Sequence, residues 1–485
     1  MHADIPALSR EWTQTGPKTY ERAVDDLEKL YLFFAGIGHG RPEKQNWHTT
    51  TAIKVETERE GFVEDVKEAW KALRYDHPNL SAVVQDGRWI YHVADEQELC
   101  LWLQETFYVH DVDQTARQLY PFNTNPSTRA VLHVLPRSQE LVLQAPHTHV
   151  DGIGMVTAFD RMMRFLVAPL ATQPNFGKEG SNLIPPLSIT AEVPKYTVSQ
   201  KQTWDSVFQS FISQFPSIRV HTENIGEPAR KAKLQWLTFT ADETARIVAR
   251  SKELGFSVTA AVQAAISHAA IIHGQTNSTA HTTLAIYNAR EYINPQLYPH
   301  QKLVGPHVFA LPAVIPVTPD SFIETARQAK QIFIDYKKDG FLRAISPVYV
   351  SEFVAALSAP PPPEMPVPAD LQLSSLGVMN KYIDPVYWPS EQGSGKGRPH
   401  LKVQDLWIAL DILTPDVAAE VWTFNERLVI QLIYNEAFHR EESITYLLGL
   451  IQEQLTQGLG LNLGTDTGVP GDEGFLEIQK ANGKD

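Results

Sequence analysis

The stretch LVLQAPHTHVDGIG at residues 141–154 joins an apolar run to two histidines, an aspartate and two glycines. The run LVLQ has the composition of a buried β-strand, and the apolar spacing after Gly152 predicts a helix that extends to about Leu166. A histidine at the end of a strand lies at the edge of a sheet and not in a packed interior. His147, Asp151 and Gly152 therefore form a candidate catalytic motif with the pattern H-x-x-x-D-G.

The chemistry of this motif starts from the imidazole. A neutral imidazole accepts a proton from a hydroxyl or an amine near pH 7. Two roles are open to Asp151, which either contacts the imidazole directly or points away and fixes the turn through a salt bridge. Gly152 permits a positive φ or the close approach of another backbone. A polar turn with a solvated histidine and a helix-capping aspartate explains the same pattern equally well, so the motif alone does not establish a site.

Length, composition and charge limit the class of protein. The 485 residues exceed the size at which one core stops growing, which favours two domains, and 43% apolar with 20% charged residues is typical of a globular enzyme. A net charge of −14 argues against nucleic-acid binding, because the phosphates would be repelled. No apolar run is long enough for a membrane span and no signal peptide is recognised, so we expect a cytoplasmic monomer without a membrane partner.

The single cysteine excludes an intramolecular disulfide and a cysteine zinc site. Cys100 lies on the apolar stripe of ELCLWL at residues 98–103, which predicts a buried and unreactive thiol. The histidines show no metal-ligand spacing, so we expect no metal site.

Helical and strand patterns alternate along the whole chain, which predicts a mixed α/β fold. Helices are predicted over 19–35, 61–73, 240–254 and 257–274, and strands over 129–135, 140–144, 282–290, 370–378 and 405–413, with a hairpin over 419–436 that turns at Asn425 and Glu426. Segment 176–235, with its many polar residues and prolines, is interpreted as a crossover linker between an N-terminal half (1–175) and a C-terminal half (236–465). The prolines at 360–368 predict an extended connection, and residues 466–485 a tail.

The order of these features resembles the CoA-dependent acyltransferase superfamily, which includes plant acyltransferases with an HxxxD motif, chloramphenicol acetyltransferase and peptide-synthetase condensation domains. The likeness rests on H-x-x-x-D-G after a strand, on TADETARIVARSKELGFSVTAAVQAAISHA at 240–269, and on LAIYNAREYINP at 284–295 followed by Gly305. More narrowly, the sequence is similar to the fungal trichothecene 15-O-acetyltransferase group. That similarity is carried by REWTQTGPKTYERAVDDLEKLY at 10–31, QAPHTHVDGIGM at 144–155 and SSLGVMNKYI at 374–383.

The resemblance implies two similar halves, each a mixed sheet with helices, on either side of a central tunnel. It implies that His147 is the general base and that the acceptor attacks the thioester of an acyl-CoA directly. It also implies that Asp151 pairs with Arg290 and does not relay charge. His149 becomes a bystander, because the spacing of the family selects His147.

Two further groups of candidate residues follow from this reaction: donors to the negatively charged oxyanion, and residues that contact the acyl-CoA. A tetrahedral oxyanion needs hydrogen-bond donors, for which Ser374, Ser375 and the backbone N–H of Gly152 are candidates; polar residues at a sheet end explain the serines at least as well. The stretch GSGKGR at 393–398 lacks the spacing of a phosphate loop and is interpreted as a flexible loop. Candidates for contacts with the phosphates of CoA are Lys396, Arg398 and Lys402.

The sequence also departs from its relatives. Pro146 stands where condensation domains carry a second histidine, and the DFGWG stretch of plant enzymes is missing from a region that here reads SSLG at 374–377. We expect an acetyl-CoA-dependent O-acetyltransferase, with acetyl-CoA as co-substrate and no other cofactor. Its acceptor would be a hydroxyl of a hydrophobic secondary metabolite, such as the C-15 hydroxyl of a trichothecene-like sesquiterpenoid. Two alternatives stay open: an acyltransferase whose donor is bound to a carrier protein, and a binding or pericyclase-like protein in which His147 is vestigial.

Overall fold

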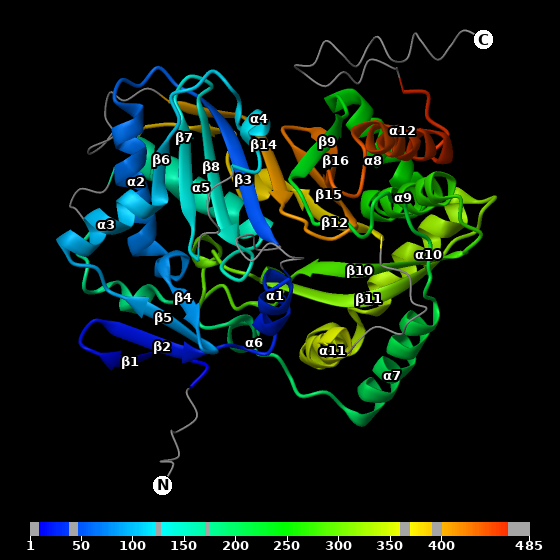
Figure 1. Ribbon diagram of the computed structural model, residues 1–485, viewed down its shortest axis with the longest axis horizontal. Helices are drawn as coiled ribbons and strands as arrows, with labels where there is room; N and C mark the ends of the chain where they lie inside the picture. The colour runs from blue at the N-terminus through cyan, green and yellow to red at the C-terminus, as the bar shows by residue number, and fades with distance from the viewer. Residues whose placement is uncertain are drawn as a thin grey trace.

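Two β-sheets with helices packed on them form the left and right halves of the molecule in Figure 1. The structure, a computed structural model, describes residues 9–37, 47–122, 128–169, 174–358, 369–389 and 400–463. The mixed α/β class predicted from the sequence is confirmed. The proline run 360–368, Lys396, Arg398 and the tail 466–485 lie outside the described residues.

The sheet of the left half has the strand order β13-β14-β3-β8-β7-β6. Its strands are β3 (His48–Glu56), β6 (Phe107–Val109), β7 (Val131–Leu135), β8 (Glu140–Pro146), β13 (Val386–Tyr387) and β14 (Leu401–Leu410). Helix α5 (Gly152–Val167) contacts β3 and packs against α2 (Phe62–Asp76), so the two helices form a layer on this sheet. The predicted strands at 129–135 and 140–144 and the helix after Gly152 are confirmed.

Strand β14 comes from the C-terminal part of the sequence and nevertheless belongs to the left sheet. It pairs antiparallel with β3, from Lys402 opposite Glu56 to Leu410 opposite Thr49. This pairing covers the edge that β3 would otherwise expose to solvent. The predicted C-terminal half therefore contributes β13 and β14 to the left sheet, so the two sheets are not separated at residue 236.

The sheet of the right half has the order β12-β15-β16-β9. Its strands are β9 (Ala232–Thr238), β12 (Leu371–Val378), β15 (Val417–Phe424) and β16 (Arg427–Asn435), and its helices are α8 (Ala241–Glu253), α9 (Val258–Gly274), α10 (Phe322–Asp335) and α12 (Glu441–Gly458). The alanine-rich α9 is buried on most faces between β12, α10 and α12. The hairpin between β15 and β16 turns at Asn425 and Glu426 as predicted, both with positive φ, which matches the twist of the strands.

Below the two large sheets in Figure 1, strands β10 (Ala280–Asn288) and β11 (Val308–Pro316) form a two-stranded sheet. Helices α7 (Val198–Ser213) and α11 (Phe341–Ser358) pack on β11. Helix α11, which we did not predict, is the core of a segment that is long and apolar enough to cross a membrane by length and composition alone. In this fold the same helix contacts β11, α7 and α1 (Glu28–Ala35).

The N-terminal part of the chain differs from the sequence-based expectation. The predicted helix 19–35 is wrong in its first half, where β2 (Thr19–Ala23) pairs with β5 (Arg88–His92), and only Glu28–Ala35 is helical. A short strand fits the same run of residues, and its backbone N–H and C=O groups form hydrogen bonds in a sheet with the order β1-β2-β5-β4. The other short elements are α3 (Glu96–Thr106), α4 (Ala116–Leu119), α6 (Leu187–Thr190), β1 (Thr13–Gly16) and β4 (Val83–Gln85).

The prediction of a buried thiol at Cys100 is wrong, because the residue is exposed. Helix α3 buries Trp102, whose ring stacks on Trp70 with 5.4 Å between the ring centroids. Side chains two positions apart in a helix point about 200° from each other around the helix axis. Burial of Trp102 therefore turns Cys100 toward solvent. The buried residues of this helix are Trp102 and Thr106, so Cys100 does not lie on its buried side.

Candidate active site

His147 is the first residue after β8 and lies where the strand leaves the sheet. Its backbone N–H donates to the carbonyl oxygen of Trp47 at 3.1 Å. The imidazole lies near two aromatic rings, with centroid distances of 4.7 Å to Tyr31 and 5.9 Å to Trp47. The residue as a whole is partly buried. The strand end therefore places His147 at a boundary of the left sheet, as the sequence predicted, and the structure adds two aromatic neighbours.

The surroundings of His147 keep its imidazole neutral at pH 7. Burial lowers the pKa of the ring below its usual value, while the charge of Asp151 and the backbone carbonyls of His147 and Val150 act in the opposite direction. Burial outweighs them, so the net shift is downward. Atom Nδ1 is buried, and no group forms a hydrogen bond with it that meets the usual geometry. The ring is thus an unprotonated base without a hydrogen-bonded orienting partner.

Asp151 caps the N-terminus of α5, and its carboxylate binds groups other than the His147 imidazole. Its carboxylate accepts two hydrogen bonds from Arg290, both of 2.9 Å, one from the backbone N–H of Gly154 at 2.6 Å and one from that of His307 at 2.7 Å. Burial alone would raise the pKa of Asp151, but Arg290 holds it below its usual value. The ion pair that the resemblance implied is present, and it occupies both carboxylate oxygens.

Arg290 reaches this position from a short turn that follows β10 and not from the strand itself, which ends at Asn288. Its guanidinium also donates to the carbonyl oxygens of Leu303 at 2.9 Å and Gly305 at 3.1 Å. The backbone N–H of Asp151 points to the same Gly305 oxygen at 3.4 Å. The segment around Gly305 is therefore bound from both halves of the molecule, which fixes Asp151 relative to the C-terminal half.

His307 is a site residue that the sequence reasoning missed. It contributes its backbone N–H to Asp151, a role that any residue but proline can fill, so no side-chain motif signals it. Burial lowers the pKa of its imidazole to about 4, and the nearby Arg290 acts in the same direction. Its Nδ1 atom is buried without a hydrogen-bond partner.

The two glycines of the motif differ in how much space they have. Gly152 begins α5 without the positive φ that we considered, and a Cβ there would lie 3.3 Å from a Leu376 side-chain carbon. At Gly154 a Cβ would lie 2.7 Å from a Val150 side-chain carbon, 3.0 Å from the Arg290 guanidinium and 3.1 Å from the Gly305 carbonyl oxygen. The close backbone approach that we expected at Gly152 therefore occurs at Gly154.

His149 is held by the small sheet of the left half. Its Nε2 lies 2.8 Å from the carbonyl oxygen of Ala82 and its Nδ1 3.0 Å from the Thr148 hydroxyl. The ring packs edge-on against Trp89, and burial lowers its pKa to about 4. Both nitrogens are occupied, so this geometry leaves no nitrogen of His149 for proton transfer.

The structure separates the two candidate serines. Ser375 lies 2.8 Å from the hydroxyl of Thr259, on the side of β12 that faces α9. Ser374 is the strand partner of Glu420 and points to the other side of the sheet, because successive residues of a strand alternate. Leu376, at the bulge that follows, has its side chain next to Gly152, where a Cβ would lie 3.3 Å from it. Of the two serines, Ser374 therefore faces the side that approaches the motif.

Lys402 does not meet the motif residues. It lies at the start of β14 opposite Glu56, with its amine 3.6 Å from the Glu56 carboxylate, whereas Leu410 pairs with Thr49 at the end near His147. Eight residues of strand separate these ends by about 27 Å. A contact of Lys402 with CoA stays a prediction.

Relatives of known name align along most of the chain, although no protein-family model matches the sequence. The O-acetyltransferase pigM of Monascus ruber is 25% identical over 475 residues, which cover 93% of this chain and 88% of pigM. The acetyltransferase pigO of the same organism is 25% identical over 483 residues, which cover 93% of this chain and 98% of pigO.

Solved structures share the fold. The TRI3 trichothecene 15-O-acetyltransferase of Fusarium sporotrichioides superimposes with a TM-score of 0.78 at 17% identity and covers 96% of this chain and 100% of its own. The condensation domain of the monacolin K polyketide synthase MokA gives a TM-score of 0.60 at 11% identity, over 91% and 97% of the two chains. The chain therefore has the fold that the TRI3 acetyltransferase shares with condensation domains, and its similarity to named fungal acetyltransferases supports an acyltransferase.

Proposed function

We propose that the protein transfers an acetyl group from acetyl-CoA to a hydroxyl group of a hydrophobic secondary metabolite, with His147 as the general base. The observation that carries this proposal is the complete occupation of the Asp151 carboxylate by Arg290 and two backbone N–H groups. It leaves a neutral, partly exposed imidazole as the base, held at a strand end beside the ion pair that joins the two halves. The similarity to pigM and pigO supports acetyl transfer as the reaction.

The reaction begins with proton transfer to the imidazole. Because Nδ1 of His147 is buried near two carbonyl groups, the neutral ring carries its proton there and offers Nε2 to the acceptor hydroxyl. As Nε2 takes the proton, the hydroxyl oxygen attacks the thioester carbonyl and a tetrahedral oxyanion forms. The oxyanion collapses, the C–S bond breaks, and the imidazolium returns the proton to the thiolate of CoA. The products are an acetate ester and CoA with a free thiol.

We propose two groups as hydrogen-bond donors to the oxyanion. The backbone N–H of Gly152 belongs to the first turn of α5, where N–H groups have no acceptor within the helix and the helix dipole favours negative charge. The hydroxyl of Ser374 is the second candidate, since Ser375 is engaged with Thr259. A donor that is aimed at the oxyanion contributes about 3–4 kcal/mol to catalysis of this type.

The acceptor class follows from the groups around the base. The rings of Tyr31 and Trp47 both lie near His147, and Phe34 stacks on Trp47 with 4.0 Å between the centroids. Such a surface favours a largely apolar acceptor with few polar groups. A trichothecene-like sesquiterpenoid with a free C-15 hydroxyl is the specific acceptor that we propose, because a solved structure with this fold is named for that reaction.

The test is release of thiol from acetyl-CoA in the presence of a panel of lipophilic alcohols that includes such a sesquiterpenoid. We expect turnover with at least one alcohol, loss of about a thousandfold or more in His147→Ala, and an unchanged rate in His221→Ala, whose side chain is exposed. A His147→Ala variant with full rate would exclude the base that we propose. Transfer from an acetylated carrier protein and none from acetyl-CoA would favour the condensation-type alternative, and ligand binding without transfer from either donor the non-catalytic one.

A further inference from the structure

A general base needs a fixed ring orientation, and His147 lacks the hydrogen bond that usually provides it. In catalytic histidines the second ring nitrogen normally binds a carboxylate or a carbonyl group, which sets both the tautomer and the orientation. Here the Asp151 carboxylate is bound by Arg290, and Nδ1 of His147 lies near two backbone carbonyl groups without a hydrogen bond of the usual geometry. Packing contacts with the rings of Tyr31 and Trp47 therefore contribute to the orientation of the imidazole.

These packing contacts come from two aromatic rings that depend on one helix. Tyr31, which is 8% exposed, lies on α1 and approaches the imidazole at 4.7 Å with an angle of 33° between the ring planes. Trp47 lies 5.9 Å from the imidazole and edge-on to Tyr31, and it is stacked on Phe34. Phe34 is three residues after Tyr31 and shares its face of the helix. Helix α1 thus supplies one neighbour of the imidazole and supports the other.

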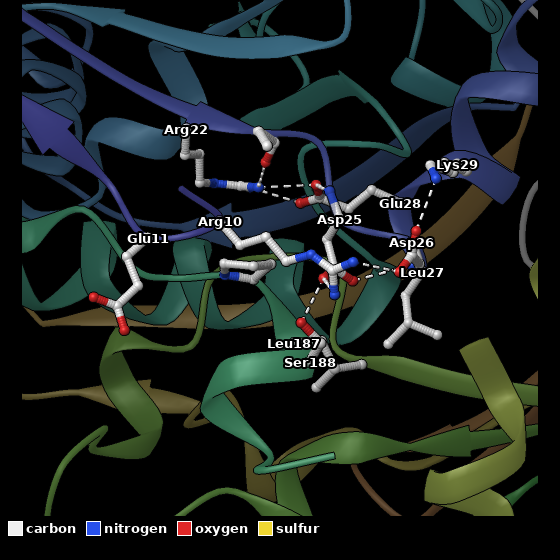
Figure 2. A network of polar contacts seen from close by, with 12 residues as sticks. Arg10, Glu11, Arg22, Asp25, Asp26, Leu27, Glu28, Lys29, Leu187 and Ser188 are labelled. Atoms are coloured by element: carbon white, nitrogen blue, oxygen red, sulfur yellow. Dashed lines mark hydrogen bonds and ion pairs between the residues drawn. The ribbon is translucent and has the colours of Figure 1, made fainter. Parts of the chain in front are cut away.

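Helix α1 has only eight residues, so its position depends on contacts outside the helix. Figure 2 shows the network that binds its first turn. Glu28, one turn before Tyr31, accepts hydrogen bonds of 2.9 and 2.6 Å from the guanidinium of Arg22. The same carboxylate accepts from the indole of Trp89 at 3.0 Å and from the backbone N–H of Asp25 at 2.8 Å. Both members of this ion pair are buried, which makes the geometry specific.

Two further contacts tie the first turn of α1 to its surroundings. Arg22 lies on β2 with its guanidinium 5.1 Å from the ring centroids of both Trp12 and Trp89. Asp25 accepts a hydrogen bond from the backbone N–H of Leu27 at 3.0 Å and another from the hydroxyl of Ser188 in α6. The helix is therefore bound to the small sheet of the left half and to the segment that follows α5.

We propose that Tyr31 is a positioning residue for His147 and that the buried Arg22–Glu28 ion pair anchors the helix that presents it. The inference rests on the proposed role of His147 as general base. A cavity of about 30 Å³ is lined by Tyr31 together with Arg22, Glu28 and His307. Because Tyr31 contacts both this cavity and the imidazole, we expect loss of its ring to give the imidazole more room and access to water.

The reactivity of His147 toward diethyl pyrocarbonate tests the positioning without an acceptor. The extent of modification at His147, located by fragment mass spectrometry, is measured from pH 5 to pH 8 for the wild type, Tyr31→Phe and Tyr31→Leu. We expect Tyr31→Phe to match the wild type, because the ring is kept. In Tyr31→Leu the pKa of His147 should rise toward the usual value near 6.5, because burial is what lowers it. An unchanged pH midpoint in Tyr31→Leu, or an equal shift in Tyr31→Phe, would overturn the proposal.

Turnover provides a second measurement. With an acceptor found by the thiol-release assay, Tyr31→Leu should lower kcat by about tenfold to a hundredfold, while KM for acetyl-CoA changes less than about twofold. A purely structural role would lower the amount of folded protein without this split. If no acceptor supports turnover, the proposed function fails, but the modification experiment still decides whether Tyr31 sets the environment of His147.

The anchoring part is tested with Glu28→Gln, which removes the charge and keeps the shape. It should shift the pH midpoint of His147 in the same direction as Tyr31→Leu, and the double variant should shift it no further than Tyr31→Leu alone. Glu291→Gln serves as the control, because Glu291 forms an exposed ion pair of 2.8 Å with Lys337. Additive shifts in the double variant, or equal shifts in Glu28→Gln and Glu291→Gln, would contradict an effect through Tyr31.

Discussion

The guanidinium of Arg290 binds both carboxylate oxygens of Asp151 at 2.9 Å, although 139 residues separate the two in sequence. The pair is almost fully buried, and each partner also binds backbone groups of the segment from Leu303 to His307. A buried, bidentate pair of this kind fixes geometry more than it adds stability. It connects the helix after the catalytic histidine to the C-terminal half.

Asp151→Asn should therefore lower stability as strongly as turnover. The variant leaves the Arg290 charge buried without a counter-charge, which costs about 3–5 kcal/mol in such pairs. Urea unfolding and kcat are measured together, with Asp113→Asn as control because its ion pair with Arg137 is exposed. A variant of wild-type stability that has lost turnover would instead indicate that Asp151 relays a proton.

Local patterns in the sequence predicted several elements of the fold, including α5, which Asp151 caps, and the two helices after Thr240. The helix pair after Thr240 is present because its caps are local: the Thr240 hydroxyl accepts from the backbone N–H of Glu243 at 3.3 Å, and the Ser257 hydroxyl accepts from that of Ala260 at 3.2 Å. The pairing of Asp151 with Arg290 came from the resemblance to a family. Spacing alone left two roles open for the aspartate.

Contacts between distant segments were not predictable in the same way. Strand β14 reads as a strand of the C-terminal half, but its partner β3 lies more than 300 residues earlier, and no local pattern records that pairing. Tyr31 reads as one apolar residue of an amphipathic run, and only the folded chain brings it to His147. His307 acts through its backbone, so its side chain carries no signal of the role.

Gly154→Ala should be far more damaging than Gly152→Ala. A Cβ at Gly154 meets Val150, the Arg290 guanidinium and the Gly305 carbonyl at 2.7 to 3.1 Å, and the carbonyl is backbone that cannot rotate away. We expect a loss of about 1–3 kcal/mol or more in unfolding free energy and a fall in kcat as Arg290 shifts. At Gly152 the neighbours are side-chain carbons of Leu376 and Ile408 at 3.3 and 3.4 Å, which can adjust. Equal melting temperatures of the two variants would contradict this difference.

Alanine substitutions of the two serines of β12 should have different effects on kcat and on stability. Ser374→Ala is expected to lower kcat by about tenfold to a hundredfold with little change in KM, as for loss of an oxyanion donor. Ser375→Ala removes the contact with Thr259 and should cost about 1 kcal/mol of stability with kcat within about twofold of wild type. The opposite ranking of kcat would place the oxyanion on the α9 side of the strand.

The stability of Glu420→Gln relative to the wild type should increase as pH rises. Glu420 is 7% exposed, its Oε2 atom has no hydrogen-bond partner, and burial raises its pKa to about 8.

In the unfolded chain the pKa of a glutamate is about 4.3, so between pH 4.3 and pH 8 the folded state retains a proton that the unfolded state releases. The folded wild type therefore loses stability as pH rises from about 4.3 toward 8, whereas a glutamine does not titrate. The advantage of Glu420→Gln over the wild type should grow with pH, by on the order of 4 kcal/mol between pH 4.5 and pH 8, in urea unfolding. Glu105→Gln, at an exposed position, should show no such slope. A difference between Glu420→Gln and wild type that does not vary with pH would mean that Glu420 is already ionised in the folded protein at low pH.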